Sequence, residues 1–524
     1  MDNPQMRIIL SLIILLFATK AFAAGECASL ARLTLASTTV THADAVAAGA
    51  FKTPANKAFP TLPAFCRVTG VIHPSSDSSI EFEVWMPSAG WNNRFQGVGN
   101  GGFAGSINYE QMANALAHGY TTASTDTGHS AGATEASWAL AHPEKIVDFG
   151  YRAIHQMTVN AKAIIRAYYG EAPGHSYFSS CSNGGRQALM EAQRFPEDYD
   201  GILAGAPANY WTHLLASSVV NLLALAGDAY IPPKKLPAIT AAALAACDAL
   251  DGVKDGIIEN PLRCHFDPAP LQCQGAETDS CLTAAQTTAL KTLYSGGKLA
   301  NGKQVFPGYS PGGEAVPGGW ALWITGSAPE RSLMYAFGTQ FYKYMMFNNA
   351  AWDYHTFNID RDTKAADDRM APILNATSPD LSRFQARGGK LILYHGWNDA
   401  AIAPRNTIDY YNSVTAKMGA GKTQSFVRLF MIPGMQHCFG GAGTASFGQL
   451  TVGGGDADHD IDAALERWVE ANVAPEQVIA AKRANDFDPT SKVSRTRPIC
   501  AYPATAHYKG SGSTDDAANF VCAK

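Results

Sequence analysis

The stretch SYFSSCSNGGRQALMEAQRF, residues 176–195, changes its hydrophobic pattern in the middle. Its first six residues form a short run typical of a strand, whereas RQALMEAQRF has the spacing of a helix. SNGG, 182–185, lies between the two, at the tip of a predicted strand-to-helix turn. YDGILAGAP, 199–207, predicts the next strand. The region is therefore a β-α-β unit, which favours a parallel sheet covered by helices.

A serine at such a tip is the setting of a nucleophile elbow, G-x-S-x-G, although Ser180 replaces the first glycine here. A serine nucleophile needs a base and a group that orients the base. In α/β-hydrolases these follow in the order Ser, Asp or Glu, His, each after a strand. LILYHGWND ends in Asp399 and FVRLFMIPGMQH ends in His437, so the order predicts a triad with Ser182. Each residue alone has a structural alternative: a turn serine, a helix cap or a satisfied polar histidine.

The same alternation continues on both sides of the turn. Strands are predicted at 80–87, 119–129, 388–399 and 425–434, and helices at 112–119, 147–169, 404–418 and 460–473. The alternation of strands and helices stops from 208 to 368, where glycine and proline are frequent and four cysteines occur. We therefore predict an α/β-hydrolase fold with a mostly parallel sheet, formed by 24–207 and 369–524, and a large inserted lid domain at 208–368.

The N-terminus has the features of a secretory signal peptide. Arg7, an apolar run from Ile8 to Phe17 and the small-x-small sequence Ala21-Phe22-Ala23 predict cleavage after residue 23. No later segment is apolar enough to span a membrane, so we expect a secreted or periplasmic protein. The net charge is −5 and positive and negative residues are mixed along the chain, so the sequence has no basic stretch that would indicate nucleic-acid binding.

Ten cysteines in an exported chain indicate disulfides, although sequence alone cannot fix their pairing. Nearness suggests Cys27–Cys66, Cys247–Cys264, Cys273–Cys281 and Cys500–Cys522. Cys181 and Cys438 are left over, next to Ser182 and His437. A serine and a histidine that share a hydrogen bond bring these neighbours to a separation compatible with a disulfide. A free or redox-active Cys181 is the alternative, which an oxidising compartment disfavours.

CSNGGRQ with Ser182, HGWNDAAIAP with Asp399 and PGMQHC with His437 resemble the tannase and feruloyl esterase family of α/β-hydrolases. The resemblance implies a Cys181–Cys438 disulfide beside the triad. It also implies a serine carboxylesterase that acts on esters of aromatic acids. Feruloyl esterase is the first choice, then tannase, then mono(2-hydroxyethyl) terephthalate hydrolase. Arg331 is present, but it cannot be assigned to a terephthalate carboxylate.

An oxyanion hole needs two backbone N–H groups, of which Asn183, directly after the nucleophile, should supply one. The loop GNGGFAG, 99–105, can approach a substrate closely and should supply the other. The resemblance puts this group at Gly101 or Gly102. The alternative is that GNGGFAG is only a tight turn.

CDALDGVKDGIIENPLRC, 247–264, crowds Asp248, Asp251 and Asp255 into eight residues. Such close carboxylates repel unless a cation neutralises them, and hard oxygen ligands suit Ca²⁺. The resemblance adds the backbone carbonyls of Val253 and Ile257 and makes the ion a structural one in the lid. A solvated acidic turn is the alternative.

Several further expectations follow from single residues. Glu191 and Arg194 should be solvated, Trp397 should be either pocket wall or core, and Asn375 lies in a glycosylation sequon. The expected partner is a small aromatic-acid ester or a feruloylated plant polysaccharide, with no oligomeric state assigned. A hypothesis of another class is a calcium-stabilised module that binds polysaccharide without catalysis.

Overall fold

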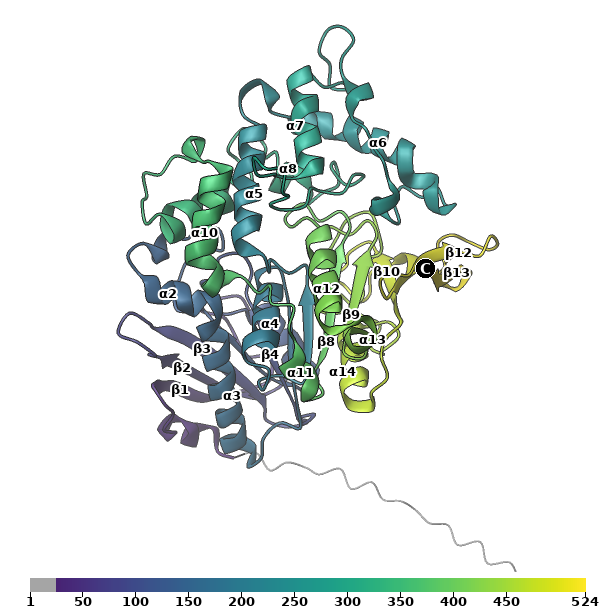
Figure 1. The fold of residues 1–524 in the computed structure, drawn as a ribbon. Coiled ribbons are helices and arrows are strands. Elements are labelled where there is room, and N and C mark those ends of the chain that lie inside the picture. The colour runs from purple at the N-terminus through teal and green to yellow at the C-terminus, as the bar shows by residue number, and fades with distance from the viewer. Residues whose placement is uncertain (1–24) are drawn as a thin grey trace, which may run out of the picture.

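A computed structural model describes residues 25–524, so the predicted signal peptide, 1–23, lies outside the described residues. A nine-stranded sheet in the order β1-β2-β3-β5-β4-β6-β7-β8-β9 forms its centre (Figure 1). The strands are β1 (Thr38–Val46), β2 (Phe65–Ile72), β3 (Ile80–Pro87), β4 (Arg94–Val98), β5 (Thr121–Thr125), β6 (His175–Cys181), β7 (Gly201–Gly205), β8 (Lys390–Gly396) and β9 (Val427–Ile432). β10 (Gln477–Arg483) pairs with β11 (Val493–Cys500), and β12 (Thr505–Tyr508) pairs with β13 (Phe520–Ala523).

The sheet changes direction at β5. β1, β2, β3 and β5 pair antiparallel, whereas every pairing from β5 through β4, β6, β7 and β8 to β9 is parallel. The mostly parallel sheet is thus present as predicted. The antiparallel strands β1 and β2 at its edge were not predicted, because their burial is partial and their pattern is weak.

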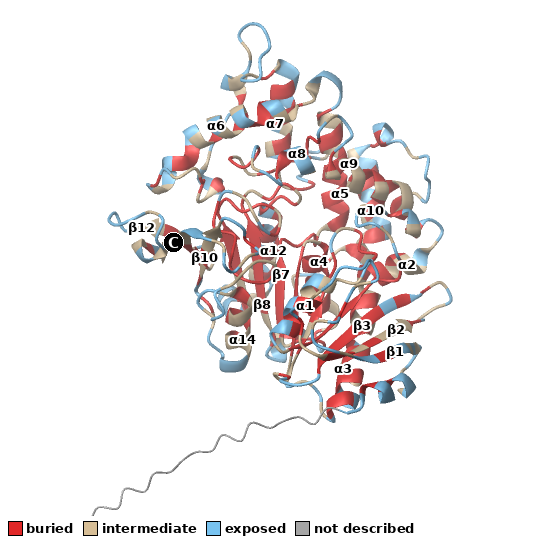
Figure 2. Ribbon diagram, turned by 180° about the vertical axis from the view of Figure 1, so that it is seen from behind, coloured by how far each residue is buried: buried red, intermediate tan, exposed pale blue. Residues whose placement is uncertain are grey.

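Both faces of the parallel part are buried, which is why its strands read as continuous apolar runs. In β8, Leu391 and Leu393 join one core, and Ile392 and Tyr394 join the other. α3 (Ala153–Tyr169), α4 (Asn183–Arg194) and α12 (Arg405–Met418) cover the first face, and α1 (Tyr109–Ala117) and α14 (Ile461–Ala471) cover the second. Figure 2 shows the strands as a buried layer between these helices.

A helical region is inserted between β7 and β8 and lies above one end of the sheet (Figure 1). It contains α5 (Trp211–Ala224), α6 (Leu236–Cys247), α7 (Ala284–Ser295), α8 (Trp320–Trp323), α9 (Leu333–Gln340) and α10 (Ile359–Leu374). α5 packs against α9 and α10, and these helices share an apolar core. Three short helices complete the fold: α2 (Pro143–Val147), α11 (Ser382–Ala386) and α13 (Ala420–Gln424).

The cysteines form five disulfides, and they are the pairs expected above: Cys27–Cys66, Cys181–Cys438, Cys247–Cys264, Cys273–Cys281 and Cys500–Cys522. Within 25–524 no single helix is long and apolar enough to cross a membrane. α5 and the segment Gly227–Asp251 reach that length only together, with a bend of 102° between them.

Two expectations about single residues are decided by the fold. Glu191 is not solvated: it is only 1% exposed, on the side of α4 that faces α3 and the turn before β7. Its charge suggested a surface position, but α4 is covered on nearly all sides. Trp397 belongs to the core, because it is buried among the residues of the first face.

Candidate active site

Ser182 occupies a sharp turn between β6 and α4. Its backbone has φ 68° and ψ −124°, a conformation that residues other than glycine rarely adopt. Close packing explains the glycines that follow: a Cβ on Gly184 would lie 2.0 Å from the Ser180 hydroxyl, and one on Gly185 would lie 2.3 Å from the Gly205 carbonyl oxygen. Ser180 can therefore replace the usual first glycine of the elbow because position 184 has no side chain.

The side chains of Ser182, His437 and Asp399 form a chain of hydrogen bonds. His437 Nε2 lies 2.9 Å from Ser182 Oγ, and His437 Nδ1 lies 2.7 Å from Asp399 Oδ2. Asp399 comes from the loop after β8 and His437 from the loop after β9, both at the end of the sheet where β6 delivers Ser182. The structure thus brings together the three residues that the sequence predicted as a triad.

Asp399 is buried and holds four hydrogen bonds. Oδ2 accepts one from His437 and one from His395 Nε2 at 3.0 Å, and Oδ1 accepts from the backbone N–H groups of Ala401 and Ile402, both at 2.8 Å. Burial alone raises the pKa of a carboxyl, but the two histidines outweigh it and hold the pKa of Asp399 below its usual range. Asp399 is therefore ionised, and the Nδ1 atom of His437 carries the proton.

The backbone N–H groups of Gly102 and Asn183, close to Ser182, have no hydrogen-bond partner within the described chain. Asn183 begins α4, where N–H groups have no intrahelical acceptor. Gly102 and Asn183 line the same pocket as Ser182, whereas Gly101 is exposed and does not line it. A Cβ on Gly102 would lie 2.2 Å from the Ala133 carbonyl oxygen, so this position of the loop requires glycine.

A pair of buried amides fixes the glycine loop to the nucleophile helix. Asn100 N–H donates to Gln187 Oε1 at 2.9 Å, and Gln187 Nε2 donates to Asn100 Oδ1 at 3.1 Å. Gln187 lies on α4, five residues after Ser182. The pair therefore sets the position of the loop relative to Ser182.

A buried guanidinium completes the support of the elbow. Arg186 Nε donates to Asn183 Oδ1 at 2.8 Å, and its other nitrogens donate to the carbonyl oxygens of Phe149 at 2.9 Å and Gly150 at 2.8 Å. Burial lowers the pKa of Arg186 to about 9. Among the described residues, no carboxylate forms an ion pair with Arg186. Its positive charge is therefore not neutralised by an ion pair, and it lies close to the N-terminus of α4.

The disulfide Cys181–Cys438 links the residue before Ser182 to the residue after His437, with Cα atoms 6.0 Å apart. It is buried beneath the triad. The covalent link fixes the loop that carries His437 to the end of β6. This limits the freedom of His437 relative to Ser182, which preorganises the hydrogen bond between them.

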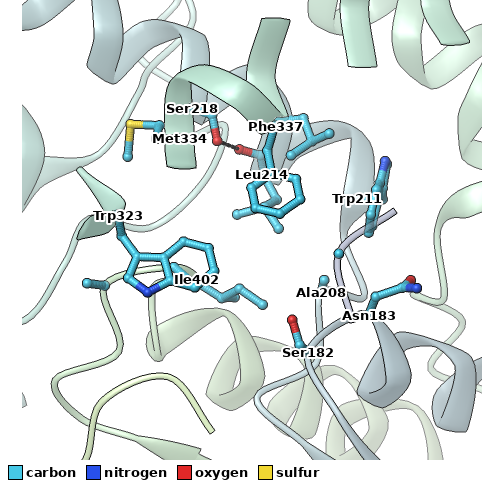
Figure 3. A pocket seen from close by; sticks show the side chains of 14 residues that line it. Ser182, Asn183, Ala208, Trp211, Leu214, Ser218, Trp323, Met334, Phe337 and Ile402 are labelled. Carbon is cyan, nitrogen blue, oxygen red and sulfur yellow. Dashed lines mark hydrogen bonds between the residues drawn. The ribbon is translucent and has the colours of Figure 1, made fainter. Parts of the chain in front are cut away.

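A pocket opens at Ser182 and lies under the inserted helices (Figure 3). Its walls are mostly apolar: Trp211, Leu214, Leu215, Trp323, Met334, Phe337 and Ile402. Among residues 25–524, no charged side chain lines it. Arg331 is exposed and is not part of this lining. The apolar walls fit a small organic group next to Ser182.

The acidic stretch lies in a turn from Asp248 to Asp251 and the loop after it. Asp248 accepts hydrogen bonds from the N–H groups of Gly256 and Ile257, and Asp255 pairs with Arg497 at 2.6 Å. Burial raises the pKa of Asp251 and Asp255, and each has a neighbouring carboxylate that adds to this. The carbonyl oxygens of Val253 and Ile257 accept no hydrogen bond from the described residues.

Sequence reasoning missed four residues of the site: Asn100, Arg186, Gln187 and His395. Two of them, Arg186 and Gln187, stand inside the quoted motif CSNGGRQ, and Asn100 stands inside GNGGFAG. These motifs gave a signal, but only the fold shows that Asn100 and Gln187 meet. His395 also stands inside a quoted motif, HGWNDAAIAP, but only the fold shows its contact with Asp399.

The chain matches known proteins over most of its length. It matches the family described as tannase and feruloyl esterase over residues 66–523. It is 46% identical to an uncharacterized esterase of Xanthomonas campestris pv. campestris, covering 96% of this chain and 92% of that one. It is 34% identical to a probable feruloyl esterase B-2 of Aspergillus terreus, covering 87% and 86%. The crystal structure of feruloyl esterase B from Aspergillus oryzae aligns with a TM-score of 0.87 at 31% identity, covering 95% and 99%. This likeness confirms the α/β-hydrolase fold.

Proposed function

We propose, on the premise that the chain belongs to the tannase and feruloyl esterase family and is a carboxylic ester hydrolase, that it hydrolyses esters of phenolic acids through a serine acyl-enzyme. The observation that carries the proposal is the hydrogen-bonded chain Ser182–His437–Asp399 at the mouth of an apolar pocket. Feruloyl esters are the preferred substrates in this proposal.

In the acylation step, Ser182 Oγ attacks the ester carbonyl carbon while His437 Nε2 takes the hydroxyl proton. Asp399 keeps the Nδ1 atom of His437 protonated and stabilises the positive charge that forms on the ring. The carbonyl oxygen becomes an alkoxide, to which the N–H groups of Asn183 and Gly102 donate. His437 then gives its proton to the leaving alcohol as the carbon–oxygen bond breaks.

In the deacylation step, water replaces the alcohol. His437 Nε2 takes a proton from this water, and the resulting hydroxide attacks the acyl carbon of the ester on Ser182. The tetrahedral intermediate collapses, Ser182 recovers its proton from His437, and the aromatic acid leaves. Deacylation therefore uses the same protein groups, in the same positions, as acylation.

The pocket walls support feruloyl over the two alternatives. A terephthalate monoester carries a carboxylate at its far end, and burying that charge without a cation is costly. A galloyl group carries three hydroxyls, each of which needs a hydrogen-bond partner that apolar walls do not provide. A feruloyl group is uncharged and has a single hydroxyl, which agrees with walls such as Leu214, Trp323 and Phe337.

A panel of three esters tests this order. We expect the mature protein to hydrolyse methyl ferulate with a higher kcat/KM than methyl gallate or mono(2-hydroxyethyl) terephthalate, as measured by release of the free acid. Faster turnover of either alternative would reassign the acyl preference within the family. Absence of turnover of all three, in oxidised and calcium-loaded protein, would favour another ester class or the non-catalytic binding module.

The lid loop fits a calcium ion. Carboxylates of Asp248, Asp251 and Asp255 and the free carbonyls of Val253 and Ile257 make a set of hard oxygen donors, which is the set that Ca²⁺ prefers. The ion would neutralise the crowded carboxylates and tie the loop that the disulfide Cys247–Cys264 also closes. No residue of this loop lines the pocket at Ser182, so the contribution of the ion is structural in this proposal.

We expect a calcium chelator to lower the melting temperature of the protein by several degrees, because an ion that binds only the folded chain stabilises it. Scanning calorimetry with and without the chelator measures the shift, and added Ca²⁺ should restore it. Asp251→Asn should be insensitive to the chelator, whereas Asp228→Asn, an exposed aspartate of the same insertion, should respond as the native chain does. An unchanged melting temperature in the native chain would leave the loop a solvated acidic turn.

Export is part of the proposal. The predicted signal peptide and the five disulfides both suit an oxidising compartment, outside the cytosol.

A further inference from the structure

The pocket beside Ser182 ends at a second serine hydroxyl, which the mechanism above does not use. Ser218 lies on α5 and lines the pocket. Figure 3 shows Ser182 and Ser218 at opposite ends of it. Ser218 is thus the polar group that the far end of an acyl chain on Ser182 would meet.

The path of α5 explains this placement. The N–H of Ala208 donates to the Ser182 carbonyl oxygen at 3.1 Å, so the chain enters α5 next to the nucleophile. Trp211, Leu214 and Ser218 are spaced three and four apart, which puts them on one face of the helix. At the rise of an α-helix, Trp211 and Ser218 are about 10 Å apart along the axis. One face of α5 therefore forms the wall from the nucleophile to the closed end.

The hydroxyl of Ser218 already has an acceptor. Ser218 Oγ–H donates to the carbonyl oxygen of Leu214, one turn earlier, at 3.1 Å. This bond to the i−4 carbonyl is a common arrangement for serine in helices. While this bond is held, Oγ offers the pocket its lone pairs, and turning the proton into the pocket would cost the bond to Leu214. The apolar side chains of Met334 and Phe337 stand beside it (Figure 3), so Ser218 is an isolated acceptor in an apolar wall.

We infer that Ser218 forms a subsite for a hydrogen-bond donor and accepts a hydrogen bond from the hydroxyl that a phenolic acyl group carries para to its acyl chain. The inference rests on the proposed function, because it needs the acyl group to be bound at Ser182. A para-methoxy group has no proton to donate to Ser218 Oγ. The negative charge of a carboxylate would be repelled by the lone pairs of Oγ. Ser218 therefore selects for a free para-hydroxyl.

Three methyl esters that differ only at the para position test the subsite: methyl p-hydroxycinnamate, methyl p-methoxycinnamate and methyl cinnamate. We expect the full-length mature protein to prefer the hydroxy ester over methyl cinnamate by a factor of about 5 to 10 in kcat/KM, the effect of one neutral hydrogen bond. Ser218→Ala should lose this preference, so that the ratio of kcat/KM for the hydroxy ester to kcat/KM for methyl cinnamate falls to about one. Ser217→Ala removes the neighbouring hydroxyl on α5, which does not line the pocket, and should keep the preference.

The outcomes separate the subsite from the function it rests on. Equal preference in native protein and Ser218→Ala would overturn the subsite and leave the esterase proposal intact. Lack of a para-hydroxyl preference in the native protein would overturn it as well. If no ester of this class is hydrolysed by native protein, the proposed function itself fails. Should Ser218→Ala not fold, Ser218→Cys keeps the size of the side chain but is a weak acceptor, and the same loss of preference is expected.

Discussion

Replacing Ser182 with alanine should lower kcat/KM for methyl ferulate by about 10⁴-fold or more, because the chain then has no atom to form the acyl-enzyme. The residual rate reflects binding and the two N–H groups at Gly102 and Asn183. The fold should persist, since alanine meets the same backbone constraint at φ 68° that serine meets. Melting temperature and the Cys181–Cys438 disulfide should therefore be those of the native chain.

An active-site serine probe gives an independent readout of the same change. A fluorophosphonate should add to native protein at the peptide containing Ser182 and not to Ser182→Ala, as measured by mass spectrometry. Ser425→Ala, an exposed serine that only bonds the Lys422 carbonyl oxygen, is the matched control and should be labelled and active like the native chain. Retention of a tenth or more of the activity by Ser182→Ala would mean that another group is the nucleophile.

The elements around the nucleophile could be predicted from sequence because their signals are local. The strand predicted at 80–87 is β3, Ile80–Pro87. The strand-to-helix change is where the sequence predicted it, although the turn is shorter: only Ser182 lies between β6 and α4, which begins at Asn183. The strands of a sheet that is buried on both faces are continuous apolar runs in the sequence. The polar residues of the site follow directly after such runs. Asp399 and His437 are recognisable for this reason: each follows such a run.

The parts that the sequence did not reveal depend on contacts between distant segments. Glu191 has the charge of a surface residue, yet α4 places it near His155 and Asp198, where burial raises the pKa of its carboxyl well above the usual value. Ser218 stands in an apolar helix without any motif, so its place in the pocket follows only from how α5 approaches Ser182. A pattern along the chain records which side of a helix is apolar. It does not record what that side faces.

Asp399→Asn should lower kcat/KM by about 10⁴-fold at neutral pH while leaving the site assembled. Asparagine has one oxygen and one NH₂ group in place of the two carboxylate oxygens. The two N–H groups of Ala401 and Ile402 hold the oxygen at the position of Oδ1, because only an acceptor satisfies both. The NH₂ group must then take the place of Oδ2.

At that place the NH₂ group faces His437 Nδ1, to which it donates instead of accepting. The ring of His437 is forced into the tautomer with its proton on Nε2, and this atom can no longer accept the proton of Ser182. Labelling of Ser182 by the fluorophosphonate should slow together with ester hydrolysis. Asp409→Asn, an exposed position on α12, should change neither rate. Activity of Asp399→Asn within tenfold of the native value would show that the tautomer of His437 is set by a group other than Asp399.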